Sequence, residues 1–184
     1  MGGLYKIQGL VWPEFENVNC PDLYFRGKYF IDQQQGEISV APYDALAFNT
    51  YFNSLSLYHL ARETCISRIV ASIRLTRGKG ELRLMHKSRQ GLRRVGEAIA
   101  YDCSEAQDFQ LEILVSDFND GILYWDVGTH TETIVRDMGF ATPDRPQPVK
   151  LGVVVTMFNR PVETRRFVER FAASGLADDG HSLL

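Results

Sequence analysis

The sequence predicts a mainly β protein, in which an antiparallel β-sandwich of jelly-roll type is followed by an incomplete α/β segment. Two observations lead to this prediction. Short stretches of alternating apolar and polar residues, separated by turn-forming residues, follow one another from about residue 20 to 140. Near the end, a continuous apolar run at 151–155 precedes a polar turn and a helix-compatible stretch, a pattern typical of a buried parallel strand and its helix.

The clearest strands are those whose apolar residues share one face. In residues 65–75 every second residue from Ile69 to Leu75 is apolar, and 81–87 and 109–115 alternate in the same way. Turns are expected at Arg77-Gly78-Lys79-Gly80, read as a hairpin, and at Asn119-Asp120-Gly121, because glycine tolerates positive φ. Five side chains are therefore expected in the core: Ile69, Ile73, Leu111, Ile113 and Trp125.

The remaining elements are less regular. A further strand is expected at 122–127, directly after the Asp-Gly turn. Shorter strands are expected at 23–25, 29–31, 38–40, 46–49 and 93–101, with one helical stretch at 55–62. Three prolines lie between 141 and 149 and predict a stiff linker. The predicted organisation is a sandwich at 1–140, a linker at 141–149 and an α/β segment at 150–184.

The α/β segment is expected to contain one strand and one helix. Asn159 is a suitable N-cap, Pro161 suits the first helical turn, and 162–173 is amphipathic at helical spacing. A strand, a polar turn and a helix form the opening half of a nucleotide-binding α/β unit. A parallel strand needs a partner strand, and 174–184 is too short and too polar to supply a second strand and helix. The segment is therefore expected to be a fragment.

Composition excludes several classes of protein. The formal net charge of −3 and pI of about 5.8 give no electrostatic case for nucleic-acid binding. No apolar run is long enough to span a membrane, and the first residues do not resemble a secretory signal. Cys20, Cys65 and Cys103 are widely spaced and predict buried free thiols in a reducing compartment. No histidine or cysteine spacing predicts a metal site, and a cytoplasmic location is expected.

Several motifs, taken in order, resemble those of a known family. They are FNTYFNSL at 48–55, RGKGELRLMHKS at 77–88, FNDGILYWDV at 118–127 and, after the prolines, VVVTMFNRP at 153–161. The chain resembles the amino-terminal part of galactofuranosyltransferases of glycosyltransferase family two. This resemblance implies a β-sandwich ahead of a GT-A catalytic domain. The chain departs from the family pattern at 57–60, where family members tend to carry tryptophan.

The resemblance also implies a nucleotide-sugar pocket formed by Thr156, Phe158, Asn159 and Arg160. A threonine hydroxyl suits a base or ribose, and an arginine suits diphosphate oxygens. The alternative is that Asn159 only caps the helix and Arg160 is solvated. The family's divalent metal (Mn or Mg) and catalytic base are expected beyond this chain, which is predicted to hold no catalytic residue and no cofactor. Asp178 and Asp179 are expected to be a solvated tail.

Other candidate sites lie in the sandwich. Trp125 shares the parity of Leu123 and Val127 and is expected in the core, so Tyr124 is expected to be exposed and is a candidate glycan contact. Asp117, Asn119 and Asp120 are explained by turn formation. Seven basic residues form either a solvated face or a contact for an anionic glycan, a phospholipid headgroup or a partner domain: Arg77, Lys79, Arg83, Lys87, Arg89, Arg93 and Arg94.

Two functions remain open. The first is the amino-terminal part of a glycosyltransferase that uses a UDP-galactofuranose-like donor for a cell-wall or surface polysaccharide. Its expected partners are the nucleotide sugar and a glycan acceptor, with peripheral association at the inner face of the plasma membrane and homo-oligomer formation both compatible with the sequence. The second is a stand-alone, non-catalytic sandwich that binds carbohydrate or serves in assembly.

Overall fold

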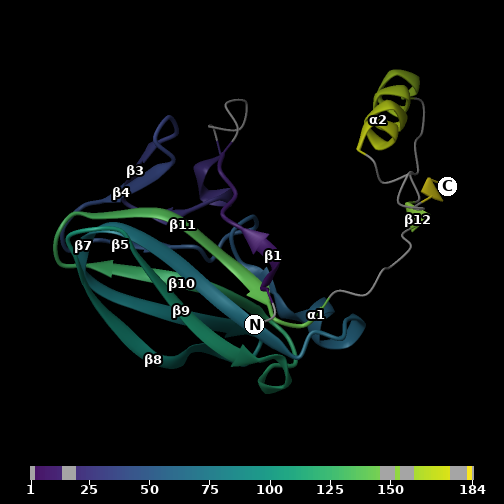
Figure 1. Ribbon diagram of the computed structural model, residues 1–184. Helices are drawn as coiled ribbons and strands as arrows, with labels where there is room; N and C mark the ends of the chain where they lie inside the picture. The colour runs from purple at the N-terminus through teal and green to yellow at the C-terminus, as the bar shows by residue number, and fades with distance from the viewer. Residues whose placement is uncertain (1–2, 14–19, 146–151, 154–159, 175–181, 184) are drawn as a thin grey trace. The chain divides into compact units, whose positions relative to one another are not determined.

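The computed structural model (Figure 1) describes residues 3–13, 20–145, 152–153, 160–174 and 182–183, and the chain separates into two units, Met1–Arg145 and Pro146–Leu184. The first unit is an antiparallel β-sandwich, as predicted. Its strands are β1 (Tyr5–Gly9), β2 (Arg26–Gly27), β3 (Tyr29–Asp32), β4 (Glu37–Val40), β5 (Ala45–Ala47), β6 (Leu55–Ser56), β7 (Arg68–Ser88), β8 (Gly91–Cys103), β9 (Gln107–Leu114), β10 (Ile122–Thr129) and β11 (Thr133–Thr142). Its helices are α1 (Leu57–Glu63) and the 3-10 turns η2 (Pro21–Leu23) and η3 (Val115–Asp117).

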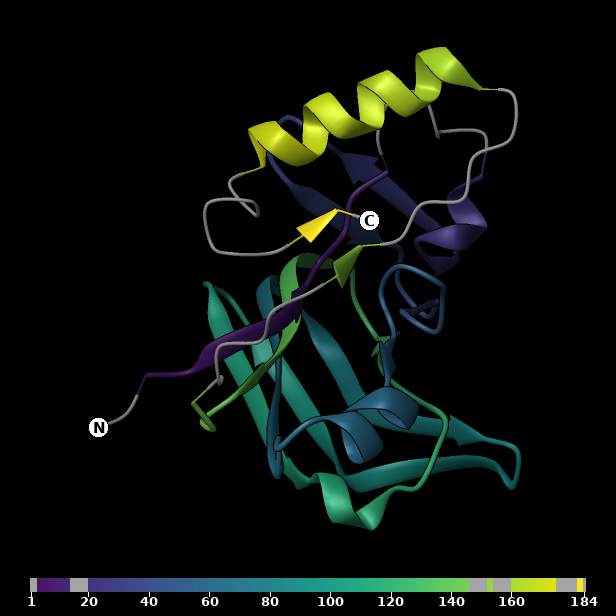
Figure 2. The same cartoon turned by 90° about the vertical axis from the view of Figure 1, so that its right-hand side faces the viewer.

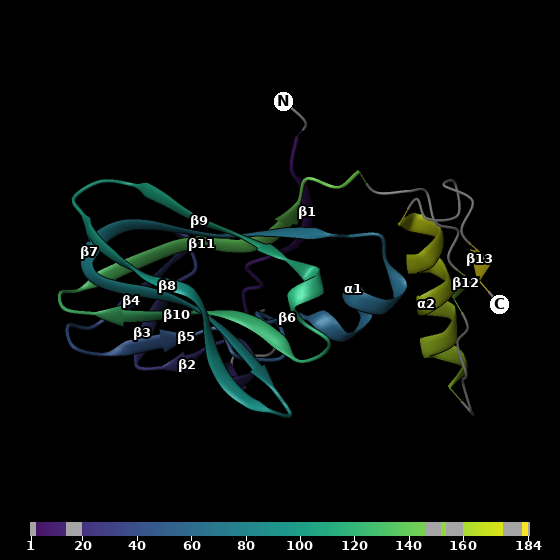
Figure 3. The same ribbon diagram turned by 90° about the horizontal axis from the view of Figure 1, so that it is seen from below.

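The long strand β7 joins the two layers of the sandwich (Figures 1 and 3). Its first half pairs with β9 on one edge and β11 on the other, and its second half pairs with β8 and β10. β11 continues to β4 and β1, and β10 continues to β5 and β6. The layer that contains β8, the second half of β7, β10, β5 and β2 is called the β10 sheet below. The short helix α1 lies against η3 and β10 at one end of the sandwich (Figure 3).

The hairpin predicted at Arg77–Gly80 is wrong, because β7 runs straight through these residues. An extra residue, Thr76, separates Leu75 and Arg77 where β11 has the consecutive partners Val135 and Ile134. Such a bulge exchanges the two faces of a strand. The residues of the core cluster are accordingly odd-numbered from Ile69 to Leu75 and even-numbered at Leu82 and Leu84, while Val70 is buried outside that cluster.

The core lies between the two layers and follows the predicted alternation. Ile69, Ile73, Ile113 and Trp125 are buried, which confirms four of the five predicted core positions, while Leu111 is only partly buried. The largest fully buried side chains are Trp125, Phe25, Phe48 and Phe140. Burial of each large apolar side chain contributes roughly 1.5–3 kcal/mol, so this aromatic core supplies much of the stability of the unit.

Strands β1 and β11 were not predicted, and for β11 the reason is visible in its register. β11 carries a bulge at Arg136, because Val135 and Asp137 face the consecutive residues Leu75 and Arg74 of β7. Its buried residues therefore change parity between Val135 and Met138, and no simple alternation remains in the sequence. β11 also extends to Thr142, so Ala141 belongs to a strand paired with β1 and not to the predicted linker.

The carboxylate of Asp144 joins the end of this unit to the start of β7. Its Oδ2 accepts hydrogen bonds from the Ser67 amide (2.6 Å), the Ser67 hydroxyl (2.9 Å) and the Arg68 amide (3.1 Å). These bonds favour the ionised form and lower the pKa of Asp144 below its ordinary value. A depressed folded-state pKa contributes stability that is present above the unfolded-state pKa of about 4 and is lost as the pH falls through the lowered value.

We therefore expect Asp144→Asn to lower the melting temperature at pH 7, and we expect this difference to shrink as the pH falls through the lowered pKa, because the wild-type carboxyl then becomes protonated as well. Thermal melts of both proteins across this range measure the effect. A difference between the two proteins that stays constant with pH would show that the charge of Asp144 does not stabilise the fold.

The second unit contains the helix α2 (Pro161–Ala173) and the two-residue strands β12 (Gly152–Val153) and β13 (Ser182–Leu183), which appear as two short arrows in Figure 2. The predicted helix is confirmed with Pro161 in its first turn, but Arg160 and not Asn159 occupies the N-cap position. The expectation that the last residues supply no partner strand is wrong, because β13 pairs in parallel with β12. Two residues suffice for this minimal partner, and the described part of 174–184 contains no second helix.

The cysteines are free, but only Cys103 is buried, and Cys20 and Cys65 are exposed. The prediction that all three thiols are buried is therefore wrong. None of the described helices is long and apolar enough to cross a membrane.

Candidate functional site

Of the predicted nucleotide-sugar residues, the structure describes only Arg160. Thr156, Phe158 and Asn159 lie outside the described residues, so their roles stay predictions. Arg160 is exposed at the start of α2, and its carbonyl accepts hydrogen bonds from the Thr164 amide (3.0 Å) and hydroxyl (2.7 Å). The backbone of Arg160 thus anchors the first turn of α2, and its side chain is accessible to solvent.

The prediction that Tyr124 is exposed is wrong. Tyr124 alternates with the core residues Leu123 and Trp125, yet it is only 4% exposed. Burial, and to a smaller extent the charge of Asp126, raises the pKa of the Tyr124 hydroxyl. Its ring offers no open face on which a sugar could stack. Alternation predicts the face of a strand correctly but does not show whether other segments cover that face.

Three of the seven basic residues predicted at 77–94 form ion pairs, namely Arg77, Lys79 and Arg83. Arg77 pairs with Glu132, and Lys79 lies 2.9 Å from Asp102. Arg93 donates hydrogen bonds to His86 and to the Asp117 carbonyl. The paired residues match the alternative of a solvated face with local ion pairs. Arg93 contacts uncharged groups that leave its positive charge unpaired, so a contact with an anionic partner stays a prediction.

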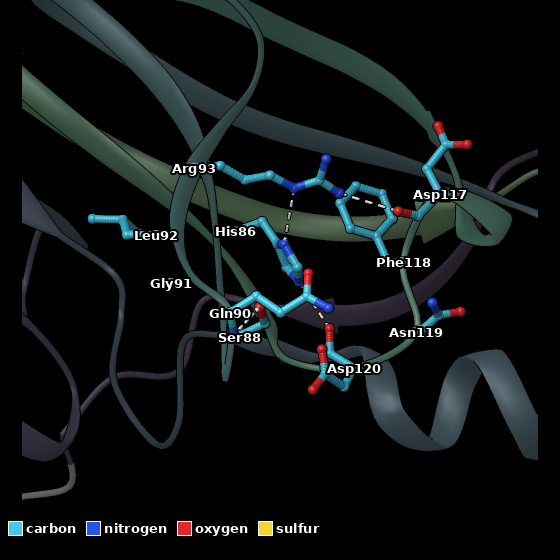
Figure 4. A pocket seen from close by; sticks show the side chains of 10 residues that line it. All are labelled: His86, Ser88, Gln90, Gly91, Leu92, Arg93, Asp117, Phe118, Asn119 and Asp120. Carbon is cyan, nitrogen blue, oxygen red and sulfur yellow. Dashed lines mark hydrogen bonds between the residues drawn. The ribbon is translucent and has the colours of Figure 1, made fainter.

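A pocket of about 350 Å³ is formed where the end of β7, the start of β8 and the loop 117–120 meet (Figure 4). His86 lies at its base, and its ring meets that of Phe118 edge to face at 4.8 Å. Arg93 Nε donates to His86 Nδ1 (3.2 Å), and an Arg93 Nη donates to the Asp117 carbonyl (3.1 Å). The Arg93 guanidinium also lies 5.0 Å from the centre of the Phe118 ring, in cation–π geometry.

These contacts define the tautomer of His86. A guanidinium can only donate, so Nδ1 must accept, and Nε2, which lies 2.8 Å from the Asp120 carbonyl, must carry the proton. Both ring nitrogens of this buried, neutral imidazole are therefore occupied. This arrangement suits a residue that orders the pocket and not a general base. Nowhere in the described part of the chain do three or more His, Cys, Asp or Glu side chains gather in a way that could hold a metal.

A second site, called the Tyr43 groove below, lies on the β10 sheet. It has a volume of about 490 Å³, and its lining comes from the turn between β4 and β5 and from β7 and β10, with Tyr43, Glu81, Arg83, Gly128 and Thr129 as its main residues. Tyr43 is 86% exposed and has a φ of 62°, the only positive φ of a non-glycine residue in the described chain.

Arg83 forms the polar side of the Tyr43 groove. Its Nε lies 3.4 Å from Glu81 and 3.8 Å from Asp126, and this buried atom has no hydrogen-bond partner in the described part of the chain. Asp126 lies behind Arg83, and burial raises the pKa of its carboxyl more than the nearby arginine lowers it. The groove thus combines an exposed aromatic ring with the partly exposed guanidinium of Arg83 and nearby carboxylate acceptors.

Sequence reasoning missed both sites. His86 and Arg93 are cross-strand partners on β7 and β8, and only the register of that pair brings them together. The one available signal for the Tyr43 groove is the pair Pro42-Tyr43, because a β-turn with proline at its second position commonly needs glycine or asparagine at its third.

Comparison with known proteins identifies one family. The family model described as galactofuranosyltransferase 2 N-terminal matches residues 16–143. No curated protein sequence matches the chain.

Among solved structures, a carbohydrate-binding module of Cellvibrio mixtus lichenase 5A, in complex with cellotriose, is 10% identical with a TM-score of 0.38, over 64% of this chain and 86% of that chain. The CBM22-1 and GH10 modules of Clostridium thermocellum xylanase 10B, complexed with xylohexaose, are 9% identical with a TM-score of 0.48, over 82% and 33%. The family GH115 4-O-methyl-α-glucuronidase BtGH115A is 13% identical with a TM-score of 0.40, over 62% of this chain and only 16% of its own.

Proposed function

Because the chain belongs to the galactofuranosyltransferase 2 N-terminal family, we propose that it is the amino-terminal part of a glycosyltransferase acting on a nucleotide-activated sugar of the UDP-galactofuranose kind. The match over residues 16–143 is the observation that carries this proposal. The proposed enzyme extends a cell-wall or surface polysaccharide in the cytoplasm, at the inner face of the plasma membrane. Its partners are the nucleotide sugar and a glycan acceptor, and the sandwich is the part that contacts the acceptor.

In this proposal residues 150–184 begin the GT-A catalytic domain. The parallel strands β12 and β13 with α2 between them in sequence form a βαβ arrangement, and ligands of such folds bind beyond the carboxyl ends of the strands. Arg160 is exposed at the start of α2. Its planar guanidinium suits two diphosphate oxygens at once, which supports a role in holding the nucleotide.

The Mn or Mg ion expected for the whole enzyme does not fit the residues described in this chain, because none of them form a cluster of suitable ligands. No step of the proposal therefore passes through a metal bound here. The same applies to the catalytic base, which we assign to the remainder of the enzyme.

We expect the 184-residue chain alone to show no sugar transfer, whereas a protein that continues into the catalytic domain transfers galactofuranose from its UDP donor to a galactan acceptor. Loss of general-base assistance alone typically lowers a rate by ~10²–10⁴-fold. Incubation of both proteins with labelled donor, manganese and acceptor measures this. Transfer by neither protein, together with glycan binding by the chain, would instead support a non-catalytic carbohydrate-binding module.

In the longer protein we expect Arg160→Ala to weaken UDP binding by about 1.5–3 kcal/mol, the usual contribution of hydrogen bonds to a charged group. Arg165→Ala, an exposed arginine of the same helix α2, is the matched control and should leave UDP binding unchanged. Titration calorimetry measures both. Equal affinities for wild type and Arg160→Ala would reduce Arg160 to a solvated residue at a helix start.

A further inference from the structure

The exposed ring of Tyr43 is held in a conformation that costs the fold free energy. Residues 41–44 form a β-turn in which the Asp44 amide donates to the Ala41 carbonyl (3.3 Å), with Pro42 second and Tyr43 third. A turn of this kind favours glycine or asparagine at its third position, because a Cβ is unfavourable at positive φ. Tyr43 has a φ of 62°, so a bulky side chain occupies a position where glycine would be less strained.

The turn that carries Tyr43 is firmly anchored to β10. The Tyr43 amide donates to the Thr129 carbonyl (3.0 Å), and the Thr129 amide donates to the Asp44 carbonyl (3.0 Å). The Thr129 hydroxyl lies 2.6 Å from the Ala41 carbonyl oxygen and accepts from the Asp44 amide (3.1 Å). The ring is thus presented to solvent by a well-connected backbone, yet at 86% exposure it buries almost nothing. A residue held in an unfavourable backbone conformation whose side chain makes few packing contacts is typical of binding sites.

The chemistry of the Tyr43 groove fits a neutral sugar. An aromatic ring supplies a flat apolar surface for the C–H face of a sugar, and Arg83, Glu81 and Asp44 supply a donor and acceptors for hydroxyl groups. Carboxylates outnumber the guanidinium around the groove, which disfavours an anionic ligand. Gly128 leaves room for the Arg83 side chain beside the groove, because a Cβ added at Gly128 would lie only 3.0 Å from Arg83 Nη2. The volume of about 490 Å³ falls within the usual ~300–1,000 Å³ of ligand sites.

We propose that the Tyr43 groove is the glycan-acceptor subsite of the sandwich, in which Tyr43 stacks on one sugar ring and Arg83 donates to its hydroxyls. This inference rests on the proposed function for the identity of the glycan. Neither Tyr43 nor Arg83 belongs to the nucleotide-sugar site proposed at Arg160.

The test is titration calorimetry of the whole chain with a galactofuranose oligosaccharide. Tyr43→Gly should lower the affinity about tenfold, as expected for the loss of an aromatic stacking contact, and should raise the melting temperature by about 2–4 °C because the backbone strain is relieved. Tyr43→Phe should keep the affinity, and Arg83→Gln should lower it. Tyr51→Ala is the control, since Tyr51 is 81% exposed and does not line the groove.

Loss of binding with a gain of stability in Tyr43→Gly would support the subsite, because a purely structural residue cannot show both. Binding that is unaffected by Tyr43→Gly, or no binding by the wild-type chain, would overturn it. Sugar transfer by the longer protein tests the proposed function separately. If that protein transfers galactofuranose but Tyr43→Gly does not change glycan binding, only the subsite is rejected.

Discussion

Gly78→Ala should destabilise the sandwich by about 2–6 kcal/mol, the sum of a strained backbone and an overpacked core. Gly78 lies in β7 beside the bulge at Thr76, with a φ of 130°. A Cβ at this position would approach the Cα of Thr133 to 2.7 Å and its Cβ to 2.8 Å. The neighbouring backbone cannot retreat, because the Thr133 hydroxyl lies 2.9 Å from the hydroxyl of the buried Tyr101.

Gly91→Ala is the matched control. Gly91 has nearly the same φ, 126°, but no atom lies within 4 Å of a Cβ added there. This variant should show the backbone strain alone, about 1–3 kcal/mol. Urea unfolding followed by tryptophan fluorescence measures both variants. Equal losses of stability in the two would show that the close approach of Thr133 contributes nothing and that only the dihedral angle matters.

His86→Ala should lower the free energy of unfolding by about 2–5 kcal/mol. The imidazole is 5% exposed and packs on Phe118. Its removal leaves a cavity and deprives Arg93 Nε and the Asp120 carbonyl of their partners. Arg93 is an exposed residue and Asp120 is half-buried, so water can replace part of these hydrogen bonds, and most of the loss should come from removal of the buried ring.

His59→Ala is the control for this change, because the side chain of His59 is 70% exposed and lies 3.4 Å from Glu63. Its effect should stay within about 0.5 kcal/mol. A double-mutant cycle of His86→Ala with Arg93→Ala tests the contact directly, since groups in contact typically couple by about 0.5–3 kcal/mol. Strictly additive losses would show that the two side chains stabilise the fold independently.

The local patterns of the sequence determined a large part of this fold. Strands β3, β4, β9 and β10 and the helices α1 and α2 lie where alternation or helical spacing predicts them, apart from shifts of a few residues at their ends, and the two strands predicted at 65–75 and 81–87 form the two halves of β7. The burial of Ile69, Ile73 and Trp125 follows from the same patterns. The galactofuranosyltransferase family was also recognisable before the structure, because the order of its short motifs along the chain can be read directly from the sequence.

Only the tertiary structure decided where that alternation breaks. The bulges at Thr76 and Arg136 reverse the faces of β7 and β11, and a bulge is defined by the partner strand opposite it. The sequence RGKG therefore suggested a hairpin, whereas Gly78 lies within a strand that changes layers.

The candidate sites were decided by tertiary structure as well. Tyr124 faces outward by parity but is covered, and His86 meets Arg93 only through the register of β7 and β8. Tyr43 is pre-organised by Thr129, a residue 86 positions away in the chain. Sequence periodicity reports which face a residue takes within its own element. The groups that then cover, pair with or expose that residue come from distant segments, and only the folded chain brings them together.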